Sequence, residues 1–298
     1  MKTLNLDYLR TFLDVIELGS FSAAADRLSL TQPAVSLQIR QLENRLGTRL
    51  VERIGRRAQP TGAGAELAGY ARELDRLAAR AVEAVSRHAT GTIGRVRIGT
   101  GATACIYLLP PLLRELRRRF PSLQITVSTG NTADVVRAVD DNTIDVALVT
   151  LPASGRLLEI TPILDDEFVL LAPASIKLPP RLTAQALSAL PILLFEPGGN
   201  TRRIADEWFR RSGITLKPEM SLGSVEAIKE LVRAGLGCAV LPAMAVQSER
   251  HRKGLVVRSL TPKLHRTLAL VIRRDKPLHR GLKEVVGALT RLSKTTTE

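Results

Sequence analysis

Residues 29–47, SLTQPAVSLQIRQLENRLG, predict a helix that has two different long faces. Apolar residues recur at the spacing of one helix face and form a stripe typical of a buried surface: Val35, Ile39, Leu42 and Leu46. Thr31 is a candidate N-cap, Pro33 falls in the first turn, where its missing N–H costs nothing, and Gly47 is a C-terminal stop signal. The stripe therefore predicts a helix with defined ends that packs one face against the core. The opposite face is not needed for the core.

The opposite face of this helix carries no acidic residue, and it comprises Gln32, Pro33, Ser36 and Arg40. Glutamine can pair with adenine, arginine with guanine and serine with phosphate, and proline offers apolar contact to a thymine methyl group. This face is therefore predicted to contact the base edges and phosphates of DNA.

The flanking segments have the pattern of a winged helix-turn-helix. Residues 7–18 carry apolar side chains at helical spacing, and GSFS at 19–22 interrupts them, with Ser22 as a candidate cap for a short helix over 23–28. Two packed helices joined by a tight turn are typical of proteins whose second helix enters the major groove. Residues 50–60 then predict a basic wing on the DNA backbone, because three arginines surround a glycine turn: Arg53, Arg56 and Arg57.

The run DYLRTFLDVIELGSFSAAADRLSLTQPAVSLQIRQLENRLGTRLVER, followed by PTGAG, resembles the N-terminal domain of the LysR-type transcriptional regulators. The motifs GSFS, TQPAVS, QI..LE..LG and T.AG occur in the family's order and spacing, which makes the resemblance specific. Val51, Pro60 and Gly62 depart from the usual Phe, Leu and Pro and affect the wing. We expect a DNA-binding domain over 1–60, with DNA contacts from Ser22, Thr31, Gln32, Pro33, Ser36, Arg40, Arg53 and Arg56.

Composition limits the function classes. A chain of 298 residues with 45% hydrophobic content can bury more than one core, so two or three domains are expected. No apolar run approaches the ~18 residues of a membrane span, and the N-terminus lacks a signal-peptide pattern, so a cytoplasmic protein without a membrane partner is expected. Cys105 and Cys238 are interpreted as buried thiols, with a redox switch as the alternative. The four histidines lack metal-ligand spacing, and neither a metal nor a cofactor is expected.

The net charge of +14 is not evidence for DNA binding. Residues 1–90 contain 13 basic and 10 acidic side chains, whereas residues 91–298 contain 30 and 19, so most of the excess lies outside the predicted DNA-binding domain. The basic runs at 117–119 and 250–253 are interpreted as solvated surfaces. The net positive charge of residues 91–298 also suits an anionic ligand.

Residues 61–89 contain a heptad seam, which comprises Leu67, Ala71, Leu74, Ala78, Ala81 and Val85. A single buried helix shares this spacing, but the charged residues between the seam positions favour an interface between two helices. The seam therefore predicts a homodimer. The family resemblance implies a linker helix that pairs two subunits on a partly palindromic DNA site. It also implies that the protein forms homotetramers and contacts RNA polymerase.

Residues 90–298 alternate between apolar strands and helices, which predicts parallel sheets covered on both faces. We expect an α/β effector domain of two hinged subdomains, as in periplasmic binding proteins: subdomain I at about 90–164 and 266–298, and subdomain II at about 165–265. A ligand is then expected between them, at the C-terminal ends of the strands.

An enzyme is the rival interpretation. GTGATA at 99–104 fits the dinucleotide-binding fingerprint, but prolines 110 and 111 interrupt the following helix and the next strand ends without an acidic residue. The sequence also contains no P-loop or nucleophile elbow, so we expect no enzymatic activity. A plain solute-binding protein is the second alternative, and it would need a signal peptide and no residues 1–60.

Hydroxyl and amide groups follow several predicted strands and can hold a small polar effector, an anion in particular. The candidate effector-binding residues are Thr100, Thr103, Asn131, Thr132, Thr150, Gly198, Thr201 and Arg202. Helix capping accounts for the threonines equally well, and Arg202 either clamps an anion or lies on the surface beside Asp206 and Glu207. Together these features predict a DNA-binding regulator in which a bound effector changes the hinge.

Overall fold

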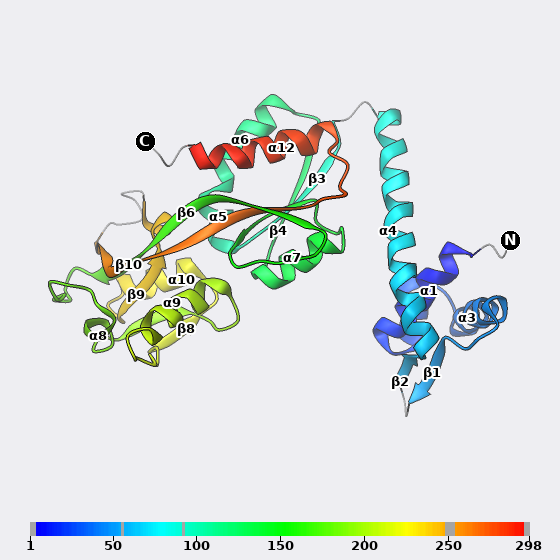
Figure 1. Cartoon of the computed structure of the whole chain (residues 1–298), viewed down its shortest axis with the longest axis horizontal. Coiled ribbons are helices and arrows are strands. Elements are labelled where there is room, and N and C mark those ends of the chain that lie inside the picture. The colour runs from blue at the N-terminus through cyan, green and yellow to red at the C-terminus, as the bar shows by residue number, and fades with distance from the viewer. Residues whose placement is uncertain (1–3, 55–56, 91–92, 248–253, 295–298) are drawn as a thin grey trace. The chain divides into compact units, whose positions relative to one another are not determined.

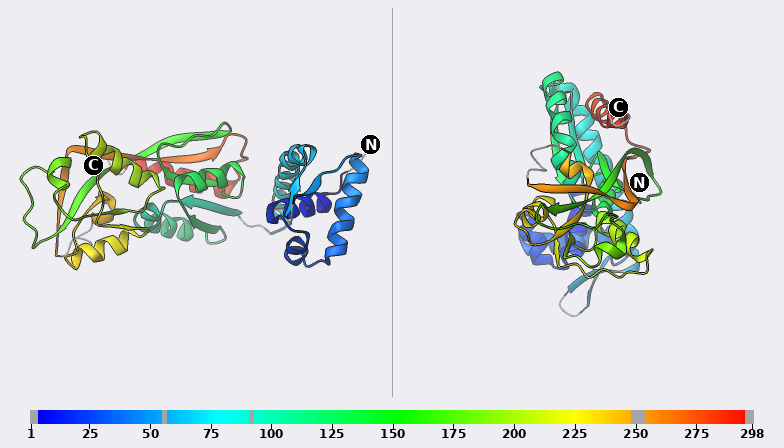
Figure 2. Two further views of the ribbon diagram at one scale, coloured as in Figure 1. Left: turned by 90° about the horizontal axis from the view of Figure 1, so that it is seen from below. Right: turned by 90° about the vertical axis from the view of Figure 1, so that its left-hand side faces the viewer.

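The computed structural model describes residues 4–54, 57–90, 93–247 and 254–294. The chain divides into two compact units, Met1–Gly91 and Thr92–Glu298 (Figures 1 and 2). Within the described ranges, no helix combines the length and the apolar character that crossing a membrane requires.

The first unit is a winged helix-turn-helix followed by a long helix. Its elements are α1 (Leu6–Leu18), α2 (Phe21–Leu28), α3 (Gln32–Leu46), the antiparallel wing strands β1 (Val51–Ile54) and β2 (Arg57–Pro60), and α4 (Gly62–Thr90). The stripe predicted on α3 is buried in the core of this unit, with Val35, Ile39 and Leu42 at most 3% exposed and Leu46 packed at the edge. The DNA-binding fold expected from the opening stretch is confirmed.

The ends of the first helices follow from local capping. Thr31 caps α3 by accepting a hydrogen bond from the Ala34 N–H, and Gly47 ends it in the left-handed conformation, as predicted. The predicted cap of α2 is wrong by two residues. Ser20, not Ser22, accepts from the Ala23 N–H, because the helix already begins at Phe21, and Ser22 is exposed on its first turn.

The linker helix α4 packs its first turns against the wing and the helices before it. Gly64 permits this approach, because a Cβ there would lie 2.0 Å from the Leu50 carbonyl oxygen. Ala71 is fully buried in the core of its own unit, which corrects the predicted seam at that position. Val85, farther along α4, is 70% exposed. The buried and exposed parts of the seam therefore serve different contacts.

The second unit contains one eight-stranded mixed sheet in the order β4-β3-β5-β10-β6-β9-β7-β8. Its strands are β3 (Arg95–Thr100), β4 (Gln124–Thr129), β5 (Val146–Thr150), β6 (Leu158–Pro173), β7 (Ile192–Phe195), β8 (Met220–Leu222), β9 (Cys238–Pro242) and β10 (Leu255–Arg273). The pairs of β3 with β4 and β5, and of β7 with β8 and β9, are parallel, as expected. The long strands β6 and β10 run antiparallel to each other and to their neighbours, which the apolar pattern did not reveal.

The unit has two halves, and in each half helices pack on both faces of the sheet. These helices are α5 (Ala102–Tyr107), α6 (Leu109–Arg119), α7 (Thr132–Asp140), α8 (Ala184–Leu187), α9 (Asn200–Arg210), α10 (Val225–Arg233) and α12 (Arg280–Thr290), with short 3-10 helices η1 (Ala243–Val246) and η2 (Arg291–Lys294). Figure 1 shows β6 and β10 running through both halves. Each half has its own apolar core, so the unit is a two-subdomain α/β fold whose halves are joined by these two strands.

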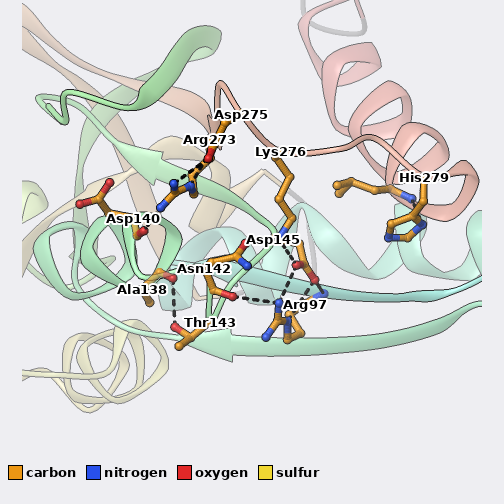
Figure 3. Close-up of polar contacts among 11 residues, drawn as sticks. Arg97, Ala138, Asp140, Asn142, Thr143, Asp145, Arg273, Asp275, Lys276 and His279 are labelled. Atoms are coloured by element: carbon orange, nitrogen blue, oxygen red, sulfur yellow. Dashed lines mark hydrogen bonds and ion pairs between the residues drawn. The ribbon is translucent and has the colours of Figure 1, made fainter. Parts of the chain in front are cut away.

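A buried carboxylate joins three segments at the start of β5, opposite the strand end where a ligand is expected. Asp145 is 3% exposed and accepts hydrogen bonds from the Arg97 backbone N–H at 2.7 Å, the Arg97 guanidinium at 2.8 Å and the Lys276 ammonium at 2.5 Å (Figure 3). Burial by itself would raise the pKa of Asp145, but the hydrogen bonds and charges of Arg97 and Lys276 outweigh it and lower that pKa. The cluster fixes β3, β5 and the connection from β10 to α12.

Candidate DNA-reading face and effector cavity

The outward face of α3 presents the predicted DNA-contacting side chains. Thr31, Pro33 and Arg40 are exposed, and Gln32 and Ser36 are partly exposed. The Gln32 Nε2 donates a hydrogen bond to the Ser36 Oγ at 2.7 Å, so these two side chains lie together one helical turn apart. The core stripe of the same helix holds this face outward.

The wing is tied to the end of α3 by a carboxylate. Glu43 Oε1 accepts hydrogen bonds from the backbone N–H groups of Leu50 at 2.8 Å and Val51 at 3.2 Å, which connects α3 to the first wing strand. Arg53 on that strand is exposed, and its guanidinium lies 5.7 Å from the centre of the Phe21 ring. Arg56 lies outside the described residues.

A cavity of about 360 Å³ lies in the second unit, at the C-terminal ends of β3, β5 and β7, with walls from both halves. It is lined by most of the predicted effector residues: Thr103, Asn131, Thr132, Thr150, Gly198, Thr201 and Arg202. Thr100 is not among the lining residues, which corrects that prediction. Its side chain is fully buried at the end of β3, and its hydroxyl donates to the Leu148 carbonyl oxygen at 2.8 Å.

Several of the lining hydroxyl and amide groups already have partners within the protein. Asn131 caps α7 by accepting from the Asp134 N–H at 2.9 Å, and the Thr132 hydroxyl donates to the Thr150 carbonyl oxygen at 3.0 Å. Thr103 has no side-chain hydrogen-bond partner among the described residues and is 7% exposed. Capping therefore accounts for Asn131, whereas the Thr103 hydroxyl is available to a ligand.

Arg202 is neither a free clamp nor a surface residue. It is 9% exposed, and its guanidinium donates to the Asp206 carboxylate at 2.8 Å, the Phe195 carbonyl oxygen at 2.5 Å and the Ser221 hydroxyl at 3.2 Å. The surface alternative is therefore wrong. Arg202 braces the rim formed by α9, β7 and β8, and clamping of an anion through its bonded nitrogens would require these bonds to break.

Arg266 and Asp166 form a buried ion pair on the two strands that join the halves, and the sequence pattern did not indicate this pair as a site. They face each other across β10 and β6, with Arg266 Nε 3.0 Å from Asp166 Oδ2, and neither residue is more than 5% exposed. Arg266 lines the cavity and also donates to the Thr201 hydroxyl at 3.0 Å. Burial raises the pKa of Asp166 and lowers that of Arg266, while their mutual attraction opposes both shifts. A charged residue inside the apolar strand LHRTLALVIR was the available signal.

The N-terminus of α9 faces the cavity without a side-chain cap. Its cap residue is Gly199, so the first N–H groups of this helix have no side-chain acceptor. The Asn200 side chain donates to the carbonyl oxygens of Thr150 at 2.7 Å and Pro152 at 2.8 Å, which joins the two halves across the cavity. Helix N–H groups of this kind favour a carboxylate or another anion.

A second polar cluster joins the two halves. Lys229 of α10 is 1% exposed and donates to the Tyr107 hydroxyl of α5 at 2.9 Å and to the Glu226 carboxylate at 3.0 Å. The Tyr107 hydroxyl also donates to Glu226. Burial, followed by the contact with Glu226, raises the pKa of Tyr107. The proton thus stays on the hydroxyl, where it completes the contact between the halves.

The glycines of the apparent dinucleotide fingerprint serve packing and a helix start in this fold. A Cβ on Gly99 would lie 2.7 Å from Ile144 and 2.8 Å from Val135, so close packing of β3 against α7 requires glycine there. Gly101 is the N-cap residue of α5, which ends at Tyr107 before Pro110 and Pro111 open α6.

Comparisons with known proteins agree with this architecture. The family model for the bacterial regulatory helix-turn-helix protein of the lysR family matches residues 6–65, and the model for the LysR substrate binding domain matches residues 89–293. The HTH-type transcriptional regulator YeiE of Escherichia coli K12 is 34% identical over 283 residues, covering 94% of this chain and 95% of that protein. A probable RuBisCO transcriptional regulator of Trichormus variabilis is 33% identical over 252 residues, covering 82% and 75%.

Solved structures show the same fold. A mutant form of Corynebacterium glutamicum OxyR with bound hydrogen peroxide has a TM-score of 0.61 and 27% identity, covering 98% of this chain and 96% of that one. CbnR, a LysR family transcriptional regulator, has a TM-score of 0.67 and 22% identity, covering 97% and 99%. Because both family models match in order and span the winged helix-turn-helix and the α/β unit, this chain belongs to the LysR family of DNA-binding transcriptional regulators with an effector-binding domain.

Proposed function

We propose that this regulator binds a partly two-fold operator as a homodimer or homotetramer through the outward face of α3. The observation that carries the proposal is the division of this helix into a buried stripe and an exposed polar face on which Gln32 and Ser36 are joined by a hydrogen bond. Thr31, Gln32, Pro33, Ser36 and Arg40 contact base edges or nearby phosphates. Ser22 and the wing arginines Arg53 and Arg56 contact the backbone.

Exposed apolar side chains on α4 support a dimer of these DNA-binding units. Tyr70, Leu77, Val82 and Val85 are all more than half exposed, although each is large and apolar. The exposed part of the predicted seam, with Ala81 and Val85, lies on the same helix. Pairing of two α4 helices buries this surface and places two recognition helices on one operator.

The effector is a small anion held in the cavity of the second unit. The uncapped α9 N-terminus and the Thr103 hydroxyl supply donors for a carboxylate, while Glu196 at the cavity accepts a donor group of the same molecule. Effector binding shifts the equilibrium between two arrangements of the halves only if the effector binds one arrangement more tightly than the other. The change at the hinge then alters the spacing of the paired DNA-binding units and their contact with RNA polymerase.

The chain acts by binding rather than by catalysis. Its family consists of transcriptional regulators, and the glycines of the dinucleotide-like segment are accounted for by packing and by a helix start. A regulator that binds the bacterial chromosome acts in the cytoplasm.

The first test is selection of bound fragments from a random-sequence duplex pool by the purified full-length chain at physiological salt. We expect enrichment of a partly two-fold site. Gln32→Ala is expected to relax specificity at one or two base pairs by roughly 1–3 kcal/mol, because it removes a bidentate base contact. Gln185→Ala, an exposed helical glutamine in the effector unit, is the matched control and should leave the selected sequence unchanged.

If Gln32→Ala loses the same amount of affinity for the selected site as for random DNA, Gln32 does not read the base sequence. Salt-dependent binding without any enriched sequence would reduce α3 to a non-specific basic surface and overturn the proposal.

A further inference from the structure

The outward face of α3 contains an apolar patch among its polar side chains. Leu37 is 52% exposed, whereas the buried apolar residues of the same helix are at most 3% exposed. Pro33 is also exposed and lies four residues before Leu37, so the two side chains are neighbours on the helix surface. We name Pro33 and Leu37 the apolar patch of α3.

The patch has no role in the core of its own unit. Leu37 is not among the residues that form or flank the apolar cluster described for this unit. On the helix it lies roughly 60° from Arg40 and roughly 40° from Gln41, both of which are exposed, so it points away from the core among polar groups. About half of this leucine is exposed, and that exposed part is free to contact a partner.

We propose that the apolar patch contacts the C5-methyl group of a thymine in the major groove, and that Leu37 thereby gives the operator a preference for a T·A pair. Thymine is the base that presents a methyl group in this groove, so an apolar side chain recognises it without a hydrogen bond. The inference rests on the proposed placement of α3 in the major groove. It adds Leu37 to the base contacts already proposed for Gln32, Pro33 and Arg40, and it assigns to Leu37 a preference for thymine.

The size of the patch favours a methyl group over a protein partner. Two adjacent side chains form a surface far smaller than the roughly 800 Å² that each partner contributes to a stable protein–protein interface. The neighbouring side chains Gln32, Ser36 and Arg40 match the edges of bases and the charge of phosphates. A methyl group within a polar, anionic groove is therefore the occupant that suits the whole face.

The test replaces each thymine of the selected operator, one at a time, by deoxyuridine, which keeps the base pair and removes only the methyl group. Dissociation constants are measured at one salt concentration for the full-length wild type, Leu37→Ala and Leu37→Gln. Leu236→Ala, a 46% exposed leucine of the effector unit, is the matched control. For the wild type we expect one thymine per half-site at which deoxyuridine weakens binding about fourfold, the factor expected for one methyl group.

In Leu37→Ala and Leu37→Gln, deoxyuridine at that position should weaken binding less than it does in the wild type, because only Pro33 of the patch remains, while Leu236→Ala should behave as the wild type. Circular dichroism spectra of the variants are compared with that of the wild type to check that they fold. Absence of a methyl effect in the wild type, or a methyl effect in both Leu37 variants as large as that in the wild type, would overturn the inference. So would a change of oligomeric state in the variants with the methyl effect intact, because the patch would then contact protein.

Failure of this inference is distinct from failure of the proposed function. If the Leu37 test fails but the wild type selects a two-fold site and Gln32→Ala lowers the sequence specificity, then α3 reads DNA without Leu37. If no sequence is selected at all, both proposals fall together.

Discussion

Single residues show how closely the parts of the first unit are packed. Gly64 and Gly69 both lie in α4, but a Cβ on Gly64 would meet the Leu50 carbonyl oxygen, whereas nothing lies within 4 Å of a Cβ on Gly69. Gly64→Ala is expected to lower the free energy of unfolding by about 1–3 kcal/mol, because backbone must move. Gly69→Ala should raise it by about 0.5–1 kcal/mol through helix propensity. Urea unfolding followed by circular dichroism measures both, and equal effects of the two changes would contradict this packing.

Thr103 is the residue whose change should affect the effector and little else. Thr103 lines the cavity, and its hydroxyl has no hydrogen-bond partner among the described residues. We expect a bound carboxylate to raise the melting temperature, with about 2.7 kcal/mol of stabilisation at a concentration one hundred times its Kd. Thermal unfolding with acetate, succinate and citrate tests this. Thr103→Val should reduce the response while leaving the ligand-free melting temperature nearly unchanged; an unreduced response would exclude Thr103 from the site.

At the scale of elements, the Asp145 cluster stabilises the junction of β3, β5 and the connection to α12. Its pKa is lowered in the folded protein, so its contribution is present above the unfolded pKa of about 3.9 and is lost as pH falls through the lower folded value. Asp145→Asn leaves the Lys276 ammonium buried without its carboxylate. We expect a loss of about 3–5 kcal/mol near neutral pH, as for other broken buried pairs.

Melting temperatures of the wild type and Asp145→Asn across pH check this prediction. The difference between the two should be largest near neutral pH and should narrow as pH falls below about 4, because the carboxylate of the unfolded state binds a proton there and that of the folded state does so only at lower pH. A difference that does not change with pH would mean that packing, rather than charge, accounts for the effect.

At the scale of the whole molecule, we expect the exposed part of α4 to pair two chains. Leu77 is 53% exposed and lies on α4 with Val85. Leu77→Asp is expected to shift the protein toward monomers in sedimentation velocity and to weaken binding to a two-fold operator more than to a half-site, because an apolar contact becomes a charged one. Ala79→Asp, an exposed change on another side of the same helix, is the control. Unchanged sedimentation of Leu77→Asp would place the dimer interface elsewhere.

Much of this protein is determined locally and could be predicted from the sequence. The stripe of Val35, Ile39 and Leu42, the Thr31 cap and the Gly47 stop are decided by side chains within one or two helical turns. The α/β class follows from alternating apolar strands and helices, and the cavity lies at the strand ends where the residues were expected.

Only the tertiary structure decided the remaining features, because they depend on contacts between residues far apart in the sequence. Thr100 is buried in the core rather than lining the cavity, and Ala71 is buried within its own unit. Arg202, a candidate for binding an anion, is instead hydrogen-bonded to other residues of the protein. The ion pair of Asp166 with Arg266 exists because β6 and β10 pair across a hundred residues of sequence. Local patterns specify which elements form and which face is apolar, but burial and hydrogen-bond partners are set by the elements that pack against them.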